Sequence, residues 1–256
     1  MTMQEHSNMN PKWWISLLVF LGIVTLLQMV YAGVIRPNAE IALAASGTAG
    51  LSSVYVILKD VEQQFCLSLM VFCLFLMGYK LWKLLGAQDI YTYDFLEDFD
   101  KNTVLDTEQA LQQLEASAYA ETPAMATWIN CLRRYKNTRN VQHAADTITA
   151  SIDTLAVQLE SGNNMIKYII WAIPSIGFVG TVRGIGQALT QADQALAGDI
   201  SGMTASLGVA FNSTLVALLI SLILMLVMHV VNNRQDMMLI KTQESCEKNL
   251  LSHLHN

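Results

Sequence analysis

Charged residues are scarce in this chain, and their absence limits the class of protein it can be. Only 14% of the 256 residues are charged, whereas 53% are hydrophobic. So few charges cannot cover the surface of an ordinary soluble domain, and this balance is typical of an integral membrane protein. The formal net charge is −6 and no basic cluster with interleaved aromatic residues is present. We therefore expect no nucleic-acid partner.

Sequence signatures of enzymes, metals and cofactors are also missing. There is no Walker lysine and no Gly-x-Ser-x-Gly motif. Gly184-x-Gly186 follows no strand and lies in an apolar run, which argues against a dinucleotide site. His253-x-His255 has no further ligands at metal-binding spacing. We predict that the protein is not an enzyme and that it holds no metal and no cofactor.

None of the four cysteines shows Cys-x-x-Cys spacing. Cys66 and Cys73 lie one heptad apart inside an apolar run, which is typical of small core residues. Cys131 and Cys246 fall in segments that we expect in the cytoplasm, where thiols stay reduced. No disulfide is therefore predicted.

Four apolar runs are each long enough to cross a bilayer. A helix rises about 1.5 Å per residue, so about 20 apolar residues span a hydrocarbon core of ~30 Å. For the first run, a signal peptide cut near Ala42-Leu43-Ala44 is the alternative, but the run exceeds the usual signal core. The sequence predicts an all-α membrane protein with four transmembrane helices, within residues 1–35, 61–86, 166–189 and 207–231.

The segments between these runs set the expected orientation. Residues 36–60 are predicted to form a loop, with Arg36-Pro37-Asn38 as a helix breaker, and the link 190–206 is acidic and lacks Lys and Arg. Residues 87–165 and the tail 232–256 are richer in basic residues. The positive-inside rule then places both termini and residues 87–165 in the cytoplasm, and the two other segments in the periplasm.

The cytoplasmic part is expected to consist of long helical extensions. Thr122-Pro123 is typical of a helix start, with an N-cap followed by proline. A heptad stripe from Val141 to Leu159 runs into the third span and predicts one long helix up to a bend at Pro174. Lys80 and Lys83, at the inner end of the second span, are expected to snorkel to the lipid headgroups.

Small and hydroxylated residues follow one helix face in each of the last two spans. Lipid rewards apolar surface, so such a stripe must face another helix or water. The two interpretations are tight helix packing, with hydroxyls bonded to the backbone, and a polar path. In the third span the stripe is Gly177, Thr181, Gly184 and Ala188, and in the fourth it is Ser206, Ala210, Ser213, Ala217 and Ser221, with Thr214 beside Ser213.

Thr181 and Thr214 are expected at the same depth in the membrane. Each lies seven residues from the outer end of its predicted span, or roughly 10 Å of helix. Two hydroxyls at one level can line a narrow ion path, to which we also assign Ser213 and Ser175. Arg183 lies nearer the outer end, where its side chain reaches the headgroups or guards the outer mouth by its charge.

No Asp, Glu or Lys lies deep in any predicted span. Intramembrane acids and bases are the residues that usually relay protons. A chain with hydroxyls but no buried acid cannot easily bind and release a proton by itself. We therefore expect the titrating carboxylate to come from the helix of a partner protein.

The segment from Ile173 to Ile185, Ile-Pro-Ser-Ile-Gly-Phe-Val-Gly-Thr-Val-Arg-Gly-Ile, resembles the motif that opens the core of the MotA/TolQ/ExbB family. These proteins are the channel subunits of ion-driven bacterial motors. Leu207–Leu219 resembles the last helix of that family. By this resemblance Thr181 and Thr214 match the pore threonines and Pro174 the helix-bending proline. Arg183 stands where many relatives of the transport branch carry Trp.

The resemblance implies an assembly and a location. It implies a homopentameric ring in the lipid of the bacterial inner membrane, around a dimer of a MotB/ExbD/TolR-like single-span protein whose Asp lies against the threonines. Four spans with both ends inside resemble the flagellar-stator layout. In that branch charged residues of the cytoplasmic segment meet the rotor, so Arg133 and Arg134 are candidate partner contacts, with a solvated face as the alternative.

The expected function is conversion of a proton or sodium motive force into rotation or conformational work. A structural membrane scaffold, whose small-residue faces only pack helices, is the main alternative. A solute transporter is a weaker one, because the two halves show no inverted repeat of broken helices.

Overall fold

The computed structural model describes two compact units, both built from helices. One unit, called unit 1, comprises Met1–Asn10, Gly78–Asn164 and His229–Asn256, and unit 2 comprises Pro11–Met77 and Met165–Met228. Every regular element in the described residues is helical, which confirms the all-α prediction. The described residues are 9–46, 53–86, 95–96, 105–117, 119–120 and 122–254.

Four helical stretches in this described part are long and apolar enough to cross a membrane, as predicted. The first of them buries almost none of its surface, and its helix α2 (Trp13–Val30) has no buried residue at all. Apolar side chains exposed along a whole helix suit lipid rather than water. The four stretches are Trp13–Ala45, Val61–Gly86, Val141–Leu189 and Ser201–His253.

The segment after α2 differs from the predicted loop. A π-helical turn, Tyr31–Ile35, leads directly into α3 (Arg36–Ser46), and α4 (Val54–Leu58) follows later, so residues 36–60 are largely helical where they are described. The Arg36 amide donates to the carbonyl of Tyr31, five residues back. Pro37 has no amide hydrogen for an α-helical hydrogen bond, and the wider π-helical turn before it accommodates this residue. The expected helix break at Arg36-Pro37-Asn38 is corrected accordingly.

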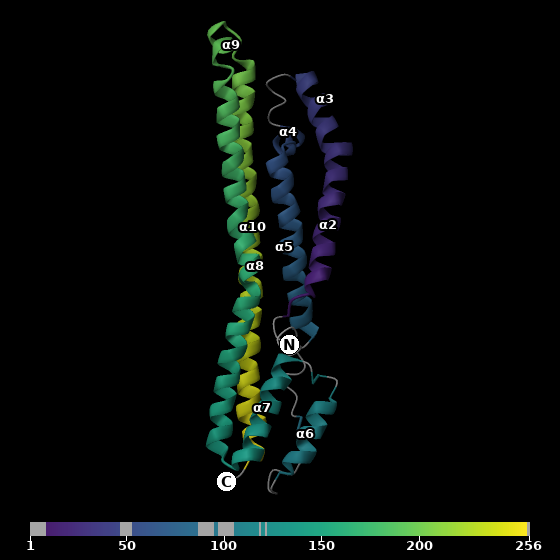
Figure 1. The fold of residues 1–256 in the computed structure, drawn as a ribbon, viewed down its shortest axis with the longest axis vertical. Helices are drawn as coiled ribbons and strands as arrows, with labels where there is room; N and C mark the ends of the chain where they lie inside the picture. The colour runs from purple at the N-terminus through teal and green to yellow at the C-terminus, as the bar shows by residue number, and fades with distance from the viewer. Residues whose placement is uncertain are drawn as a thin grey trace. The chain divides into compact units, whose positions relative to one another are not determined.

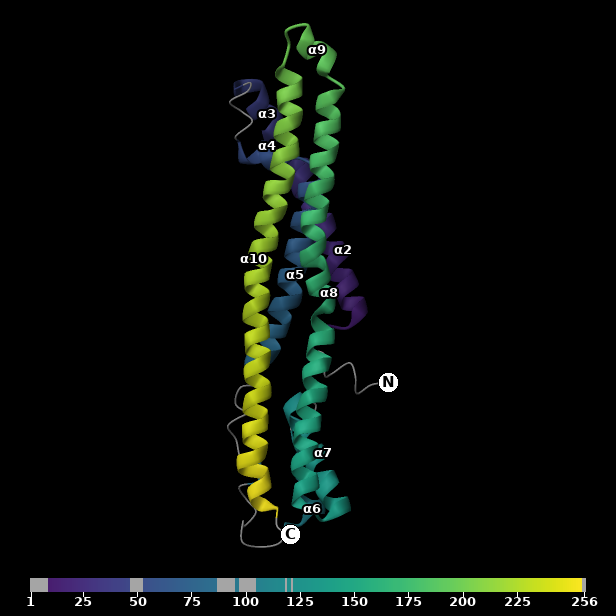
Figure 2. The same ribbon diagram turned by 90° about the vertical axis from the view of Figure 1, so that its left-hand side faces the viewer.

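Two very long helices carry the second half of the chain. Helix α8 (Val141–Leu189) is continuous through Pro174, and α9 (Ala192–Leu196) is a short turn that links it to α10 (Ser201–Ser245). Figures 1 and 2 show α8 and α10 side by side next to α9. Helix α10 begins at Ser201 rather than at the predicted Leu207, and it continues without a break into the predicted tail.

In unit 1, two capped helices start where polar side chains satisfy free amides. Helix α6 (Thr107–Ala116) begins after Asp106, whose carboxylate accepts from the amides of Glu108 and Gln109. Helix α7 (Pro123–Thr138) begins after Thr122, whose hydroxyl accepts from the Met125 amide. Both are standard N-caps, and the Thr122-Pro123 prediction is confirmed.

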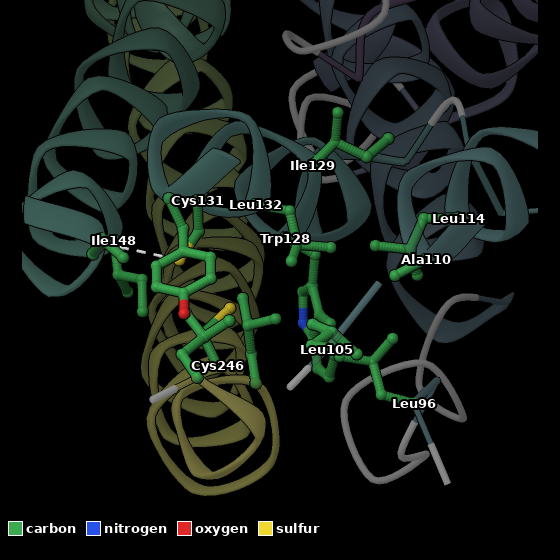
Figure 3. Packing of buried hydrophobic residues seen from close by; sticks show 14 of the residues in the cluster. Leu96, Leu105, Ala110, Leu114, Trp128, Ile129, Cys131, Leu132, Ile148 and Cys246 are labelled. Carbon is green, nitrogen blue, oxygen red and sulfur yellow. Dashed lines mark hydrogen bonds between the residues drawn. The ribbon is translucent and has the colours of Figure 1, made fainter. Parts of the chain in front are cut away.

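The core of unit 1 joins α6, α7, the first part of α8 and the C-terminal segment (Figure 3). Trp128 and Leu132 of α7 are buried in it, together with Ile148 of the predicted heptad stripe. Cys131 and Cys246 are also buried there as free thiols. Burial raises the pKa of the Cys131 thiol to about 12, so this thiol stays protonated and packs as a small apolar residue.

Lys80 lies inside unit 1 and does not reach toward headgroups. Its side chain is fully buried, and the ammonium donates to the carbonyl of Gly162 at 3.1 Å and to Oδ1 of Asn163 at 2.8 Å. The Asn163 amide donates onward to Gln235 at 2.7 Å and to Asn232 at 3.1 Å. The snorkelling prediction is wrong for Lys80, because α8 offers two acceptors for the buried ammonium, and α10 in turn accepts from the Asn163 amide.

The first prediction concerns this network of Lys80, Asn163, Asn232 and Gln235. Replacing Asn163 by Leu removes an acceptor of a buried ammonium, so we expect about 2 kcal/mol of lost stability. Thermal unfolding of the purified protein in detergent measures the loss as a lower midpoint. Asn164→Leu is the matched control, because Asn164 is the exposed neighbour. Equal midpoints for the two variants would show that the network adds nothing to stability.

Candidate ion-path site

The candidate site lies where small residues bring α8 and α10 into close contact in unit 2. A Cβ on Gly177 would collide with the side chain of Ala217 and approach the Ser213 carbonyl at 3.0 Å. A Cβ on Gly184 would lie 2.8 Å from the Ala210 backbone nitrogen. The contacts run in opposite order along the two helices, as in an antiparallel pair. The predicted small residues therefore form the surface through which the two backbones touch.

Pro174 leaves a carbonyl without its helical partner, and α10 supplies a substitute. Proline has no amide hydrogen, so the Ile170 carbonyl four residues earlier receives no bond from it. The buried Ser221 hydroxyl donates to this carbonyl at 3.1 Å. In an apolar medium such a neighbour is what allows α8 to remain helical through Pro174. Ser221 thus has a bonding role besides its place on the small-residue face.

Three hydroxyls meet between the two helices. Thr181 and Thr214 are hydrogen-bonded to each other through their Oγ1 atoms. The Thr181 hydroxyl also lies 3.0 Å from the Ala210 carbonyl, and those of Thr214 and Ser213 each lie 3.2 Å from the Gly177 carbonyl. The spacing that predicts a common depth for the two threonines agrees with this geometry.

The two threonines retain oxygen lone pairs for a ligand. A hydroxyl has one hydrogen to donate and two lone pairs, so a threonine that donates to a backbone carbonyl can still accept from water or bind a cation. Thr181 and Thr214 are half-buried, whereas Ser213 is 2% exposed and serves the helix contact. Ser175 is exposed and its hydroxyl bonds back to Trp171 in its own helix, so it does not join the cluster.

Arg183 is engaged by two acids that sequence reasoning missed. Its guanidinium lies 2.8 Å from Glu62 and 3.7 Å from Asp60, at the start of α5 (Val61–Gly86). Burial raises the pKa of the Asp60 carboxyl, and the cationic side chains of Lys59 and Arg183 only partly offset this. Matching opposite charges at neighbouring ends of different spans is the pattern that would have found the pair.

The predicted partner contacts lie elsewhere, in unit 1. Arg133 pairs with Glu115 of α6 at 2.6 Å, and Arg134 borders a shallow surface hollow with His143 and Asp146. Both are on the solvated face of α7, and neither belongs to the hydroxyl cluster. In the part of the chain that is described, no three His, Cys, Asp or Glu side chains gather as metal ligands do.

The chain matches the model of a known protein family. The model of the MotA/TolQ/ExbB proton channel family matches residues 116–244, which is half of the chain. The match includes α8, α9 and nearly all of α10, and therefore the hydroxyl cluster and its glycines. No curated protein and no solved structure matches the chain.

The second prediction tests the close approach of α8 and α10. Gly184→Ala places a methyl group against the Ala210 backbone, so we expect it to lower stability by about 1–3 kcal/mol. Gly186→Ala is the matched control, because a Cβ there meets nothing within 4 Å and alanine favours the helix. Thermal unfolding in detergent compares the two variants. If Gly184→Ala is as stable as Gly186→Ala, the helices do not depend on this contact.

Proposed function

The chain belongs to the MotA/TolQ/ExbB proton channel family, and from that premise we propose that it is the channel subunit of an ion-driven motor in the bacterial inner membrane. In this role it converts a proton or sodium motive force into rotation or conformational work. The observation that carries the proposal is the bonded pair of Thr181 and Thr214, set between two helices long enough to span a membrane.

A second protein supplies the titrating acid in this proposal. Threonine hydroxyls do not change charge at physiological pH, and residues 166–189 and 207–231 contain no Asp or Glu. The charge that a proton or Na⁺ neutralises must then come from outside these two spans. A single-span subunit like MotB, ExbD or TolR, present as a dimer with an intramembrane Asp, fits this requirement.

The proposed assembly is a homopentameric ring around that dimer. Several large apolar side chains beside the candidate site are exposed in the single chain, among them Phe178, Val182, Phe211 and Leu215. Such a surface suits contacts with lipid and with neighbouring copies. The half-buried threonine pair would then face the centre of the ring.

The proposed orientation follows the distribution of basic residues. Both termini and unit 1 lie in the cytoplasm, and the link at residues 190–206, with Asp193 and Asp199 but no Lys or Arg, lies in the periplasm. Ions then enter from the side of α9. Helices α8 and α10 each continue from unit 2 into unit 1, so the same helices that line the site reach the cytoplasmic part.

The mechanism couples neutralisation of the partner's acid to movement. An ion that enters from the periplasm binds the Asp carboxylate of the partner and cancels its charge. The neutral group is less costly to move through an apolar environment, so the partner helix can pass to the next Thr181/Thr214 pair. The hydroxyl oxygens replace part of the water that the ion loses. The long helices transmit the displacement to the cytoplasmic unit.

A structural scaffold is the second candidate, and one observation favours it. Each of the three hydroxyls is within hydrogen-bonding distance of a backbone carbonyl, which is what helix packing alone requires. The two functions differ in whether ion flux depends on the threonine oxygens.

The third prediction separates these functions. Thr181→Val and Thr214→Val keep the size of the side chain and remove the hydroxyl oxygen. We expect ion flux to fall at least about tenfold, because loss of one preorganised polar group from an active site has an effect of at least this size. The complex is purified by a tag on this chain and placed in liposomes. A pyranine signal reports proton uptake under an imposed potential, and a sodium dye reports Na⁺.

Thr204→Val is the matched control, because this exposed hydroxyl of α10 bonds back to the carbonyl of Ile200, the residue just before the helix begins. Size-exclusion profiles confirm that all variants assemble. If the wild type conducts ions and Thr181→Val and Thr214→Val conduct them equally well, the threonines are not part of the ion path. Absence of any flux from the wild-type complex would instead favour the scaffold.

A further inference from the structure

Arg183 lies two residues after Thr181 in α8, and its guanidinium forms ion pairs with acids at the start of α5. Glu62 approaches it at 2.8 Å and Asp60 at 3.7 Å. The side chains of Glu62 and Asp60 are only 13% and 16% exposed, whereas that of Arg183 is 39% exposed. Two sheltered acids therefore face a cation that is itself partly open to the surroundings.

Glu62 also lies beside the hydroxyl cluster. A Cβ on Gly180 would collide with the Ser213 hydroxyl and would also lie 3.2 Å from Cγ of Glu62. Gly180 precedes Thr181, and Ser213 precedes Thr214. The ion pair thus brings a third helix to the place where α8 and α10 present their two threonines.

The two acids are not equivalent. Asp60 lies 3.7 Å from the guanidinium, at the outer limit of an ion pair. Glu62 makes the short contact with Arg183. Glu62 is therefore the main counter-charge of the guanidinium, and Asp60 supports it.

A guanidinium stays positively charged at any physiological pH, so Arg183 would repel cations from a nearby path unless its charge is balanced. At an effective dielectric constant of about 20, an unbalanced unit charge about 10 Å away lowers the occupancy of a cation by roughly tenfold. A carboxylate in direct contact cancels most of this repulsion. Holding the guanidinium against α5 also fixes where the positive charge lies.

We propose that Glu62 is a positioning residue for ion conduction: it holds Arg183 against α5 and balances its charge, so that cations reach the Thr181/Thr214 pair. This inference rests on the proposed channel function. It assigns a role to α5 that neither the family match nor the hydroxyl cluster requires.

The test is a charge-rescue experiment in the same liposome assay. Glu62→Gln keeps the shape of the side chain and removes the main counter-charge of Arg183, so proton flux should fall by up to roughly tenfold. Adding Arg183→Gln removes that charge, and flux should return to within about threefold of wild type. Adding Arg183→Lys instead keeps the charge, and flux should stay low. A merely structural ion pair predicts no rescue, since both double variants lack the pair.

Glu40→Gln is the control for removing an exposed acid from the same unit, and size-exclusion profiles confirm assembly of every variant. If the wild type conducts and Thr181→Val blocks it, but Glu62→Gln conducts normally, the role of Glu62 is overturned and the channel function stands. The role of Glu62 is also overturned if the double variant Glu62→Gln, Arg183→Gln conducts as slowly as Glu62→Gln alone. A wild-type complex without flux contradicts the channel function itself.

Discussion

The structure of the candidate site depends on how closely α8 and α10 approach each other in unit 2. Gly177 and Gly184 leave no room for a side chain against Ala217 and Ala210, so backbone meets backbone. Only at this separation can hydroxyls of one helix reach carbonyls of the other, as Ser221 reaches Ile170 beside the proline. The bond between the threonines, and hence the proposed seat for an ion, is a consequence of that contact.

Charged groups are few in this chain, and several of the buried polar groups tie helices together. In unit 2 hydroxyls bond to carbonyls, and Arg183 joins α8 to the start of α5. In unit 1 the buried Lys80 joins α5 to α8, and Asn163 continues the network to α10. An unsatisfied polar group is costly in an apolar environment, so each of these bonds constrains which helices lie together. The same scarcity leaves few groups that can act on an ion.

The length of the apolar runs was enough to predict the spans, and helical spacing was enough to predict the stripe of small residues and the common level of the two threonines. It did not predict contacts that depend on the register of a third helix, such as Glu62 with Arg183, which are 121 residues apart. Local rules also failed at Pro37, where a π-helical turn accommodates the proline. Ser175 was assigned to the path, but its side chain is exposed and its hydroxyl bonds back to Trp171 in its own helix.

The central claim is that water and ions reach Thr214 in the assembled complex. Thr214→Cys places a thiol there, and the four native cysteines are buried, so background labelling should be low. The most direct measurement is reaction of this thiol with a membrane-impermeant cationic methanethiosulfonate added from the periplasmic side. We expect rapid labelling of this thiol, which blocks ion flux. Labelling only by a lipid-soluble maleimide, with flux unchanged, would contradict it.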